Sequence, residues 1–344
     1  MRNQEPIQLI NSANNPCIDA LILNMSINAN VVDDSTQIEA EHDAMKSRLK
    51  AVARSYDLHT GKGKRHWQEL VITLHDDAEK IKVMISLDPY RFSKSMNTFG
   101  HNFFSLTISS GFTENMLQQL IEILREVLGI YFDKLREHAR INRIDLAFDF
   151  IMDINCVDFN GLHFTASHFQ CSGLSDSFAQ FSRGAHLSTY YLGGKRGDQI
   201  VIYDRGIKLL KKGKKLDKLS GIYVRIELRL RPRSEKTYTL DNILCAHTRV
   251  AELLERFSVF RLKSLRRVTV GDTLHLFLMA CKWQGYKAVI TSVRKYSKGR
   301  AKWIERQFTK VSLDHSEMRS RLFNVLDNFA DHFGPPCNAE EYED

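Results

Sequence analysis

Three short stretches of the chain alternate between apolar and polar side chains, and their polar positions carry carboxylates, arginines and a tyrosine. They are the stretches 143–150 (RIDLAFDF), 199–204 (QIVIYD) and 225–230 (RIELRL). Side chains along a β-strand point alternately to its two faces. Each stretch therefore predicts a strand with one apolar face for a core and one open face that carries reactive groups.

The alternation assigns individual residues to the two faces. The residues expected in the core are Ile144, Leu146, Phe148, Phe150, Ile200, Ile202, Ile226, Leu228 and Leu230. The residues expected on the open face are Arg143, Asp145, Ala147, Asp149, Tyr203, Arg225, Glu227 and Arg229. Cleavage or joining of a phosphodiester needs an attacking oxygen, charge neutralisation at phosphorus and a grip on the strand. The open face offers side chains for all three tasks.

The length and the charge of the chain limit the class of protein that it can be. A chain of 344 residues with 43% hydrophobic and 26% charged residues is long enough for one large or two medium globular domains, and we expect two. Its net charge of +8 favours an anionic partner, either nucleic acid or a membrane surface. The apolar runs are shorter than the roughly 18 to 20 residues of a membrane span, and the N-terminus is too polar for a signal peptide. We therefore expect a cytoplasmic protein that does not enter the membrane.

Cysteine spacing does not indicate a metal or redox centre. The six cysteines are widely separated and none forms a C-x-x-C pair. Neither a thiolate zinc site nor a thioredoxin-like motif is therefore predicted. Free thiols in a reducing compartment are the simplest interpretation.

Periodicity along the chain predicts an α+β fold. Residues 1–15 are polar and are expected to be flexible. Apolar residues at helical spacing predict a helix over 113–138, whereas the polar stretch 153–186 has little period and is expected to be a loop. From residue 240 onward the pattern is mainly helical. We predict a catalytic domain over 16–237, a helical domain over 238–336 and an acidic tail over 337–344.

The predicted metal site follows from strand geometry. Mg²⁺ takes only one or two carboxylates and keeps water or substrate oxygens as its other ligands. Residues four apart on one strand are separated by roughly 13 Å, whereas neighbouring strands lie about 4.8 Å apart. Asp145 and Glu227 therefore form the better ligand pair for Mg²⁺ or Mn²⁺. Asp149 is a further candidate at this site, either as a partner of an arginine or at its rim.

The same residues could also serve only the structure, without taking part in chemistry. Single carboxylates on a sheet are most often solvated or salt-bridged, and Arg143, Arg225 and Arg229 could simply be their cross-strand partners. A lone tyrosine in a strand usually serves packing. The combination of these residues, rather than any one of them, favours chemistry, with Tyr203 as nucleophile and Arg143 and Arg225 beside it.

Two basic segments are candidate DNA contacts. The first follows Tyr203 and includes Arg205, Lys208, Lys211 and Lys212. The second mixes cations with aromatic rings, as phosphate contacts and base stacking require. Its candidate contacts are Lys287, Arg294, Lys295, Lys298, Arg300 and Lys302. Trp283 and Trp303 lie in the second segment, and we expect them to anchor a core rather than to stack on bases.

Three ordered blocks of the chain resemble a known family. The block 142–150 (NRIDLAFDF) is similar to T-R-L-D-L-A-F-D. The blocks 191–193 (YLG) and 200–205 (IVIYDR) are similar to Y-F-G and R-I-Y-N-K, and 223–228 (YVRIEL) is similar to W-R-V-E-I-E-L. In this order they resemble the replication initiation factor family, the rolling-circle initiators of staphylococcal-type plasmids and CTX-type filamentous phages.

The resemblance implies a function and a set of roles. Tyr203 would be the nucleophile that nicks the origin, forms a 5′-phosphotyrosyl bond and releases a 3′-hydroxyl primer, while Asp145 and Glu227 would hold the metal. It also implies a curved, mainly antiparallel sheet with helices, a homodimer and a superfamily-one helicase of the bacterial host as partner. It places recognition of origin DNA toward the C-terminus.

Two positions depart from the family pattern, and other functions compete with it. The family lysine after the tyrosine is Arg205 here, and its second glutamate falls on Arg229, which removes a possible metal ligand. The leading alternative is a DNA-binding regulator of a phage or plasmid that lacks the chemistry. A tyrosine recombinase or topoisomerase is a weaker third option, because those enzymes use helical catalytic domains.

Overall fold

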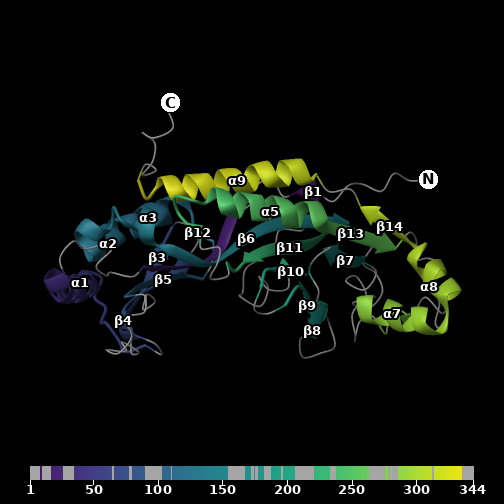
Figure 1. Cartoon of the computed structure of the whole chain (residues 1–344), viewed down its shortest axis with the longest axis horizontal. Coiled ribbons are helices and arrows are strands. Elements are labelled where there is room, and N and C mark those ends of the chain that lie inside the picture. Colours follow the sequence, from purple (N-terminus) through teal and green to yellow (C-terminus); the bar gives the residue numbers. More distant parts are fainter. Residues whose placement is uncertain are drawn as a thin grey trace. The chain divides into compact units, whose positions relative to one another are not determined.

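The helices and strands of the computed structural model are labelled in Figure 1. They belong to two compact units, each assembled from separate parts of the chain. Unit 1 comprises Met1–Pro16, Ala147–Arg229 and Val250–Arg319, and unit 2 comprises Cys17–Leu146, Leu230–Arg249 and Ser320–Asp344. The residues described are 8–9, 17–25, 35–63, 66–76, 80–89, 103–109, 111–153, 167–171, 174, 177–181, 187–194, 197–205, 221–232, 238–262, 276–277, 280, 286–311 and 314–334.

Unit 2 is built on a sheet with the strand order β3-β4-β5-β2-β6, in which the pairs β3–β4, β4–β5 and β5–β2 are antiparallel. Its strands are β2 (Cys17–Met25), β3 (His66–His75), β4 (Lys80–Pro89), β5 (Phe104–Ile108) and the first half of β6 (Arg140–Asp153). Alternate residues of β2, among them Leu21, Leu23 and Met25, are fully buried. The period of two in the sequence therefore matches a sheet that buries its apolar positions.

Two helices pack on each other in unit 2, α1 (Ser35–Ser55) and α2 (Glu114–Leu128). The hydroxyl of Thr113 accepts a hydrogen bond from the backbone N–H of Met116 and so caps the start of α2. The Arg48 Nε–H donates to the carbonyl of Val127, 2.9 Å away, at the other end. The helix predicted over 113–138 is therefore too long, since the chain turns at Gly129 with φ +60°.

Glycine, which has no Cβ, adopts the positive φ of Gly129 at little cost, and this explains where α2 stops. A short 3₁₀ turn (Gly129–Tyr131) and the helix α3 (Leu135–His138) follow, and they lead into β6. The sequence pattern missed the break because apolar spacing continues through residues 131, 132 and 135, all of which are buried.

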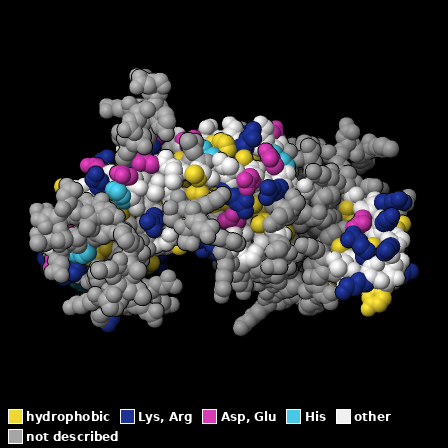
Figure 2. Space-filling view, in the orientation of Figure 1, with side chains coloured by type: hydrophobic (Ala, Val, Ile, Leu, Met, Phe, Trp, Pro, Cys, Tyr) yellow, Lys and Arg dark blue, Asp and Glu magenta, His cyan; other side chains and the backbone are white. Residues whose placement is uncertain are grey.

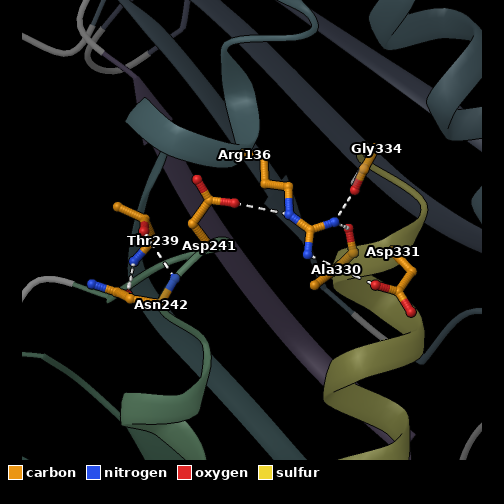
Figure 3. Close-up of polar contacts among 7 residues, drawn as sticks. All are labelled: Arg136, Thr239, Asp241, Asn242, Ala330, Asp331 and Gly334. Carbon is orange, nitrogen blue, oxygen red and sulfur yellow. Dashed lines mark hydrogen bonds and ion pairs between the residues drawn. The ribbon is translucent and has the colours of Figure 1, made fainter. Parts of the chain in front are cut away.

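A buried arginine ties the end of α9 (His315–Asp331) to α3 and to the turn after β12 (Tyr238–Thr239) (Figure 3). Arg136 donates from Nε to Asp241 Oδ1 at 2.9 Å and from a terminal nitrogen to the carbonyl of Ala330 at 3.1 Å; it also bonds the carbonyl of Gly334. A cation at a helix C-terminus satisfies carbonyls that have no partner inside the helix. The C-terminal end of α9 is thereby fixed within unit 2.

Unit 1 contains a second run of strands in the order β6-β11-β10-β9-β8. The second half of β6 is joined by β8 (Ser177–Phe181), β9 (Leu187–Leu192), β10 (Gln199–Asp204) and β11 (Gly221–Leu230), and β1 (Gln8–Leu9) pairs with the end of β6. The pairs β8–β9, β9–β10 and β10–β11 are antiparallel. The strands predicted around Tyr203 and Glu227 are thus confirmed as neighbours.

A smaller sheet in unit 1 has the order β14-β13-β7, from β14 (Phe308–Val311), β13 (Phe257–Leu262) and β7 (Ser167–Cys171). The helices α7 (Tyr286–Tyr296) and α8 (Lys298–Glu305) belong to the same unit, and α5 (Leu244–Arg256) has residues in both units. The loop predicted over 153–186 is wrong where β7 and β8 lie. The strand β7 pairs with β13, far along the chain, whereas β8 pairs with β9, the next strand in sequence.

The predicted fold class is confirmed, since the chain combines helices with mainly antiparallel strands. Helices are frequent toward the C-terminus, although β12, β13 and β14 lie there too. The linear division at residue 237 stays a prediction; the compact units are discontinuous in sequence. In the part of the chain that the structure covers, no helix is both long enough and apolar enough to cross a membrane.

Candidate active site

The register of β10 and β11 places the predicted reactive residues of unit 1 on one face of the sheet. Tyr203 lies opposite Arg225, and Val201 lies opposite Glu227. Residues directly opposite each other in an antiparallel pair share a face. The intervening pairs, Ile200 with Leu228 and Ile202 with Ile226, point to the other face and are buried. The alternation expected from sequence is therefore confirmed for these two strands.

A hydrogen bond joins the predicted nucleophile to a predicted metal ligand. The Tyr203 hydroxyl donates to Glu227 Oε1 at 2.5 Å. The two residues are diagonal neighbours across the strand pair, a spacing that an aromatic side chain can bridge. Tyr203 is only 6% exposed, yet its hydroxyl points to a carboxylate and not into an apolar core.

The second oxygen of Glu227 is held by an arginine. Arg229 donates to Glu227 Oε2 from its terminal nitrogen at 2.8 Å and from Nε at 3.3 Å. These residues are two apart on β11, so their side chains share a face. The glutamate is thus bracketed by a phenol on one oxygen and a guanidinium on the other. The bracket fixes the carboxylate and balances its charge.

A second carboxylate on this face forms a buried ion pair. The Arg225 guanidinium donates from Nε to Asp149 Oδ1 and from a terminal nitrogen to Asp149 Oδ2, both at 2.6 Å. Both side chains are buried. A two-pronged pair of this kind is among the strongest hydrogen-bonded contacts that side chains form. Asp149 is therefore an arginine partner, one of the two roles that the sequence left open for it.

In unit 2, Arg143 and Asp145 form a similar pair on β6. Arg143 Nε donates to Asp145 Oδ1 at 2.8 Å, and a terminal nitrogen of Arg143 bonds Asp145 Oδ2. Asp145 is buried, whereas the Arg143 side chain is partly exposed. Asp145 and Glu227 belong to different compact units, and their joint binding of one ion stays a prediction.

The prediction of an open face is wrong. Asp145, Asp149, Arg225 and Glu227 are all buried. Alternation shows which residues share a face but does not show whether other parts of the chain cover that face. The buried charges are tolerated because each carboxylate has an arginine beside it.

The same contacts bear on the predicted metal. All six carboxylate oxygens of Asp145, Asp149 and Glu227 accept hydrogen bonds from neighbouring side chains. Among the residues that the structure describes, no group of three or more His, Cys, Asp or Glu side chains is arranged to hold a metal ion. In this arrangement the carboxylates do not fit a divalent ion unless an arginine or the tyrosine gives way.

Arg205, predicted to contact DNA, has an unused donor next to the site. Its Nε–H is buried and has no hydrogen-bond partner within the described part of the chain. A buried donor without a partner costs free energy, so such groups point to a missing ligand more often than exposed ones do. The other predicted contacts of this segment, Lys208, Lys211 and Lys212, lie outside the described residues.

The second predicted basic segment lies on α7 and α8, where dark-blue Lys and Arg side chains gather in Figure 2. The exposed residues predicted to contact DNA here are Arg294, Lys295, Lys298, Arg300 and Lys302. Arg294 differs from the others, because it forms an ion pair with Glu305. Lys287 lies in α7, but its side chain is outside the described ones.

The expectation that Trp303 anchors a core is wrong. Its side chain is 45% exposed, while its neighbours Ala301 and Ile304 are buried. A helix of eight residues buries only one stripe, and position 303 falls beside that stripe. Trp283, for which the same expectation was made, lies outside the described residues.

The arginine pairs at this site were predicted from the sequence only in part. It left open that the arginines are partners of the acids, and the pair Arg225–Asp149 is such a contact between strands. It did not anticipate that Arg143 and Arg229 would each bind the acid two residues away on the same strand. The signal was present, since R-x-D and E-x-R spacings put both side chains on one face.

Comparison with known proteins adds no identification. Neither family models nor curated proteins match this chain. The resemblance to replication initiation factors therefore depends on the three sequence blocks alone.

Proposed function

We propose that the protein is a rolling-circle replication initiator that nicks one DNA strand at an origin through a phosphotyrosyl bond on Tyr203. The observation that carries this proposal is the hydrogen bond from the Tyr203 hydroxyl to Glu227 Oε1. A tyrosine that attacks phosphorus needs a group to take its proton, and an adjacent carboxylate at 2.5 Å is in position to do so.

The proposed reaction uses the contacts on the polar face of unit 1. As the Tyr203 oxygen bonds to phosphorus, its proton passes to Glu227 Oε1, and the bond from phosphorus to the 3′ oxygen breaks. The departing 3′ oxygen takes up a proton from solvent and becomes the primer hydroxyl. The 5′ phosphate remains on Tyr203. Arg229 keeps the carboxylate in place through its other oxygen, and is a positioning residue in this scheme.

Charge on the phosphate needs a donor that is not already committed. Arg225 is bound to Asp149 through both oxygens of that carboxylate, and Arg143 is bound to Asp145 in the same way. Arg205 has a buried Nε–H without a partner among the described residues. We therefore assign phosphate contact to Arg205, and give Arg143 and Arg225 the task of holding carboxylates.

A divalent ion remains part of the proposal through the family resemblance. Mg²⁺ or Mn²⁺ would neutralise charge on the phosphate, and Asp145 and Glu227 are the ligands that the family resemblance implies for it. No step of the scheme above runs through the ion, because the oxygens of these residues accept hydrogen bonds from Arg143, Tyr203 and Arg229.

The resemblance also supplies the proposed setting. The substrate would be origin DNA, bound as a duplex and cut in an extruded single strand. The partners would be a second copy of the chain and a superfamily-one helicase, in the cytoplasm of a bacterial host.

A second candidate is a DNA-binding regulator without catalysis. It is favoured by the burial of Tyr203, since a hydroxyl that is covered and already hydrogen-bonded is not reached by a phosphate without rearrangement. The exposed cations of α7 and α8 serve binding equally well in both candidates.

Cleavage of labelled single strands from the protein's own replicon, with Mg²⁺ or Mn²⁺ added, separates the two. The proposal expects cleavage by the wild type and none by Tyr203→Phe, which keeps the ring but lacks the attacking oxygen. Wild type that binds these strands and never cleaves them would support the regulator.

A further inference from the structure

Two short helices of unit 1, α7 and α8, form a hairpin whose connection is a single residue, Ser297. The Ser297 N–H donates to the carbonyl of Val293 at 2.8 Å, at the end of α7. Its hydroxyl accepts from the Arg300 N–H at 3.2 Å and caps the start of α8. The corner is therefore fixed by hydrogen bonds on both sides.

One side of this hairpin is packed and the other is not. The buried residues are Val289, Ile290, Ala301 and Ile304. The ion pair between Arg294 and Glu305 joins the two helices, and Glu305 is the only acid in residues 282–310. The exposed cations that remain beside that pair are Lys295, Lys298, Arg300, Lys302 and Arg306. The outer surface of the hairpin is thus strongly basic.

Two aromatic side chains of α7 and α8 are exposed as well. Tyr296, the last residue of α7, is 91% exposed, and Trp303 on α8 is 45% exposed. Large rings normally bury most of their area, because their apolar faces are costly in water. Tyr296 stands at the fixed corner, between Lys295 and Lys298 in sequence, and both of these lysines are exposed. An exposed ring between two ammonium groups is a suitable surface for a base and its flanking phosphates.

We infer that the outer surface of the α7–α8 hairpin binds unpaired DNA, with Tyr296 and Trp303 stacking on bases and Lys295, Lys298, Arg300 and Lys302 holding phosphates. In a duplex the flat faces of the bases are covered by their neighbours, whereas in a single strand they are free to stack on a protein ring. The inference rests on the proposal that this protein acts on DNA, and it assigns the extruded single strand, rather than the duplex origin, to this surface.

The test measures binding without cleavage, in the full chain with Tyr203→Phe as background. Anisotropy of a labelled mixed-sequence single strand, and of the same sequence as a duplex, is followed across a salt series. Adding Tyr296→Ala should weaken single-strand binding about tenfold, because stacking on the ring is lost. The salt slope should stay unchanged, since no phosphate contact is removed.

Two matched variants separate stacking from charge. Tyr296→Phe keeps the ring and should bind single strands like the background protein. Lys298→Ala should weaken binding and also reduce the slope of log K against log salt by about 0.7, the contribution of one phosphate contact on a single strand. Duplex binding should change little with Tyr296→Ala.

Three results would overturn the inference: no single-strand binding by the background protein, equal binding by the Tyr296→Ala and Tyr296→Phe proteins, or an equal loss for duplex and single strand. The outcomes remain distinct from those for nicking. If Tyr296→Ala weakens single-strand binding but the wild type never cleaves DNA, only the proposed function is contradicted. If the wild type cleaves DNA but Tyr296→Ala leaves single-strand binding unchanged, only this inference is contradicted.

Discussion

The Tyr203 hydroxyl and the Glu227 carboxylate are joined by a 2.5 Å hydrogen bond that crosses diagonally from β10 to β11. Tyr203 is buried, and so is Glu227, with 2% of its surface exposed. Glu227 also forms an ion pair with Arg229, and on the same face Arg225 forms an ion pair with Asp149. A phenol beside an ionised carboxylate is an arrangement that favours proton transfer when the phenol attacks an electrophile.

Replacing Glu227 by Gln should slow cleavage about 10²- to 10⁴-fold, the usual contribution of a general base. The amide keeps the size of the side chain and can still accept a hydrogen bond from Tyr203, but it cannot take the proton. Single-turnover cleavage of a labelled strand measures the effect, and denaturant unfolding checks that the variant is folded. Cleavage at the wild-type rate would remove Glu227 from the reaction.

Breaking the buried pair Arg225–Asp149 should destabilise the fold. Asp149→Asn alone or Arg225→Met alone leaves a buried charge without its partner and should lower the free energy of unfolding by about 3 to 5 kcal/mol. Removing both charges, with Asp149→Asn and Arg225→Met together, should restore much of that loss. Urea denaturation of the three variants measures the coupling.

The exposed pair Arg319–Glu255 in the same unit, with 3.9 Å between its charged atoms, serves as the control. Arg319→Met should change the free energy of unfolding far less, because water already solvates both partners. Equal losses at the two pairs would show that the Arg225–Asp149 contact has no special role in unit 1.

Arg229 should compete with a divalent ion for Glu227. Its guanidinium occupies Oε2 of that carboxylate. Removing a unit charge a few ångströms from a cation site should strengthen Mn²⁺ binding about tenfold in the variant Arg229→Gln. Titration calorimetry measures this directly, and Arg229→Lys, which keeps the charge, is the matched control. Weaker Mn²⁺ binding by Arg229→Gln than by the wild type would contradict the competition.

His247 should make unit 2 less stable in mild acid. Burial lowers the pKa of His247 below its ordinary value of 6.5, although the nearby Asp327 acts in the opposite direction. Its Nε2 lies 3.0 Å from Asp327 Oδ1 without the alignment of a hydrogen bond. Below about pH 6.5 the unfolded chain binds a proton that the folded chain binds less readily, so the free energy of unfolding falls as the pH is lowered.

The variant His247→Phe tests this dependence. It can keep the stacked contact with Phe323, whose ring centroid lies 4.2 Å from that of His247, but it has no proton to bind. Urea unfolding at pH values on both sides of 6.5 should show a smaller loss of stability in acid for the variant than for the wild type. Parallel curves for the two proteins would exclude His247 as the source.

Much of the local architecture was predictable from sequence, because period-two alternation fixes which residues of a strand share a face. This held for Ile200, Ile202, Ile226 and Leu228 on one face and for Tyr203 with Arg225 on the other. The end of α2 was not predicted, since apolar spacing continued past Gly129 while the backbone turned there.

The burial of the site could not be read from alternation. Whether a polar face is open depends on chain segments that are distant in sequence, as it does for Glu227 and Asp149. The strand β7 was missed for a related reason, because its partner β13 lies far along the chain. The strand β8 pairs with the neighbouring β9, and it was missed because the polar stretch 153–186 has little period. Burial was wrongly expected for Trp303, because a large apolar side chain favours burial but the residue type does not show which side of a short helix faces a core.

Mapping the covalent adduct shows whether Tyr203 becomes linked to DNA. The protein is incubated with an origin-strand oligonucleotide and a divalent ion, digested with trypsin, and the peptide that carries the nucleotide is identified by mass spectrometry. We predict a 5′-phosphotyrosyl bond on Tyr203. A bond on Tyr190, Tyr191 or Tyr223 instead, or cleavage without any covalent adduct, would contradict it.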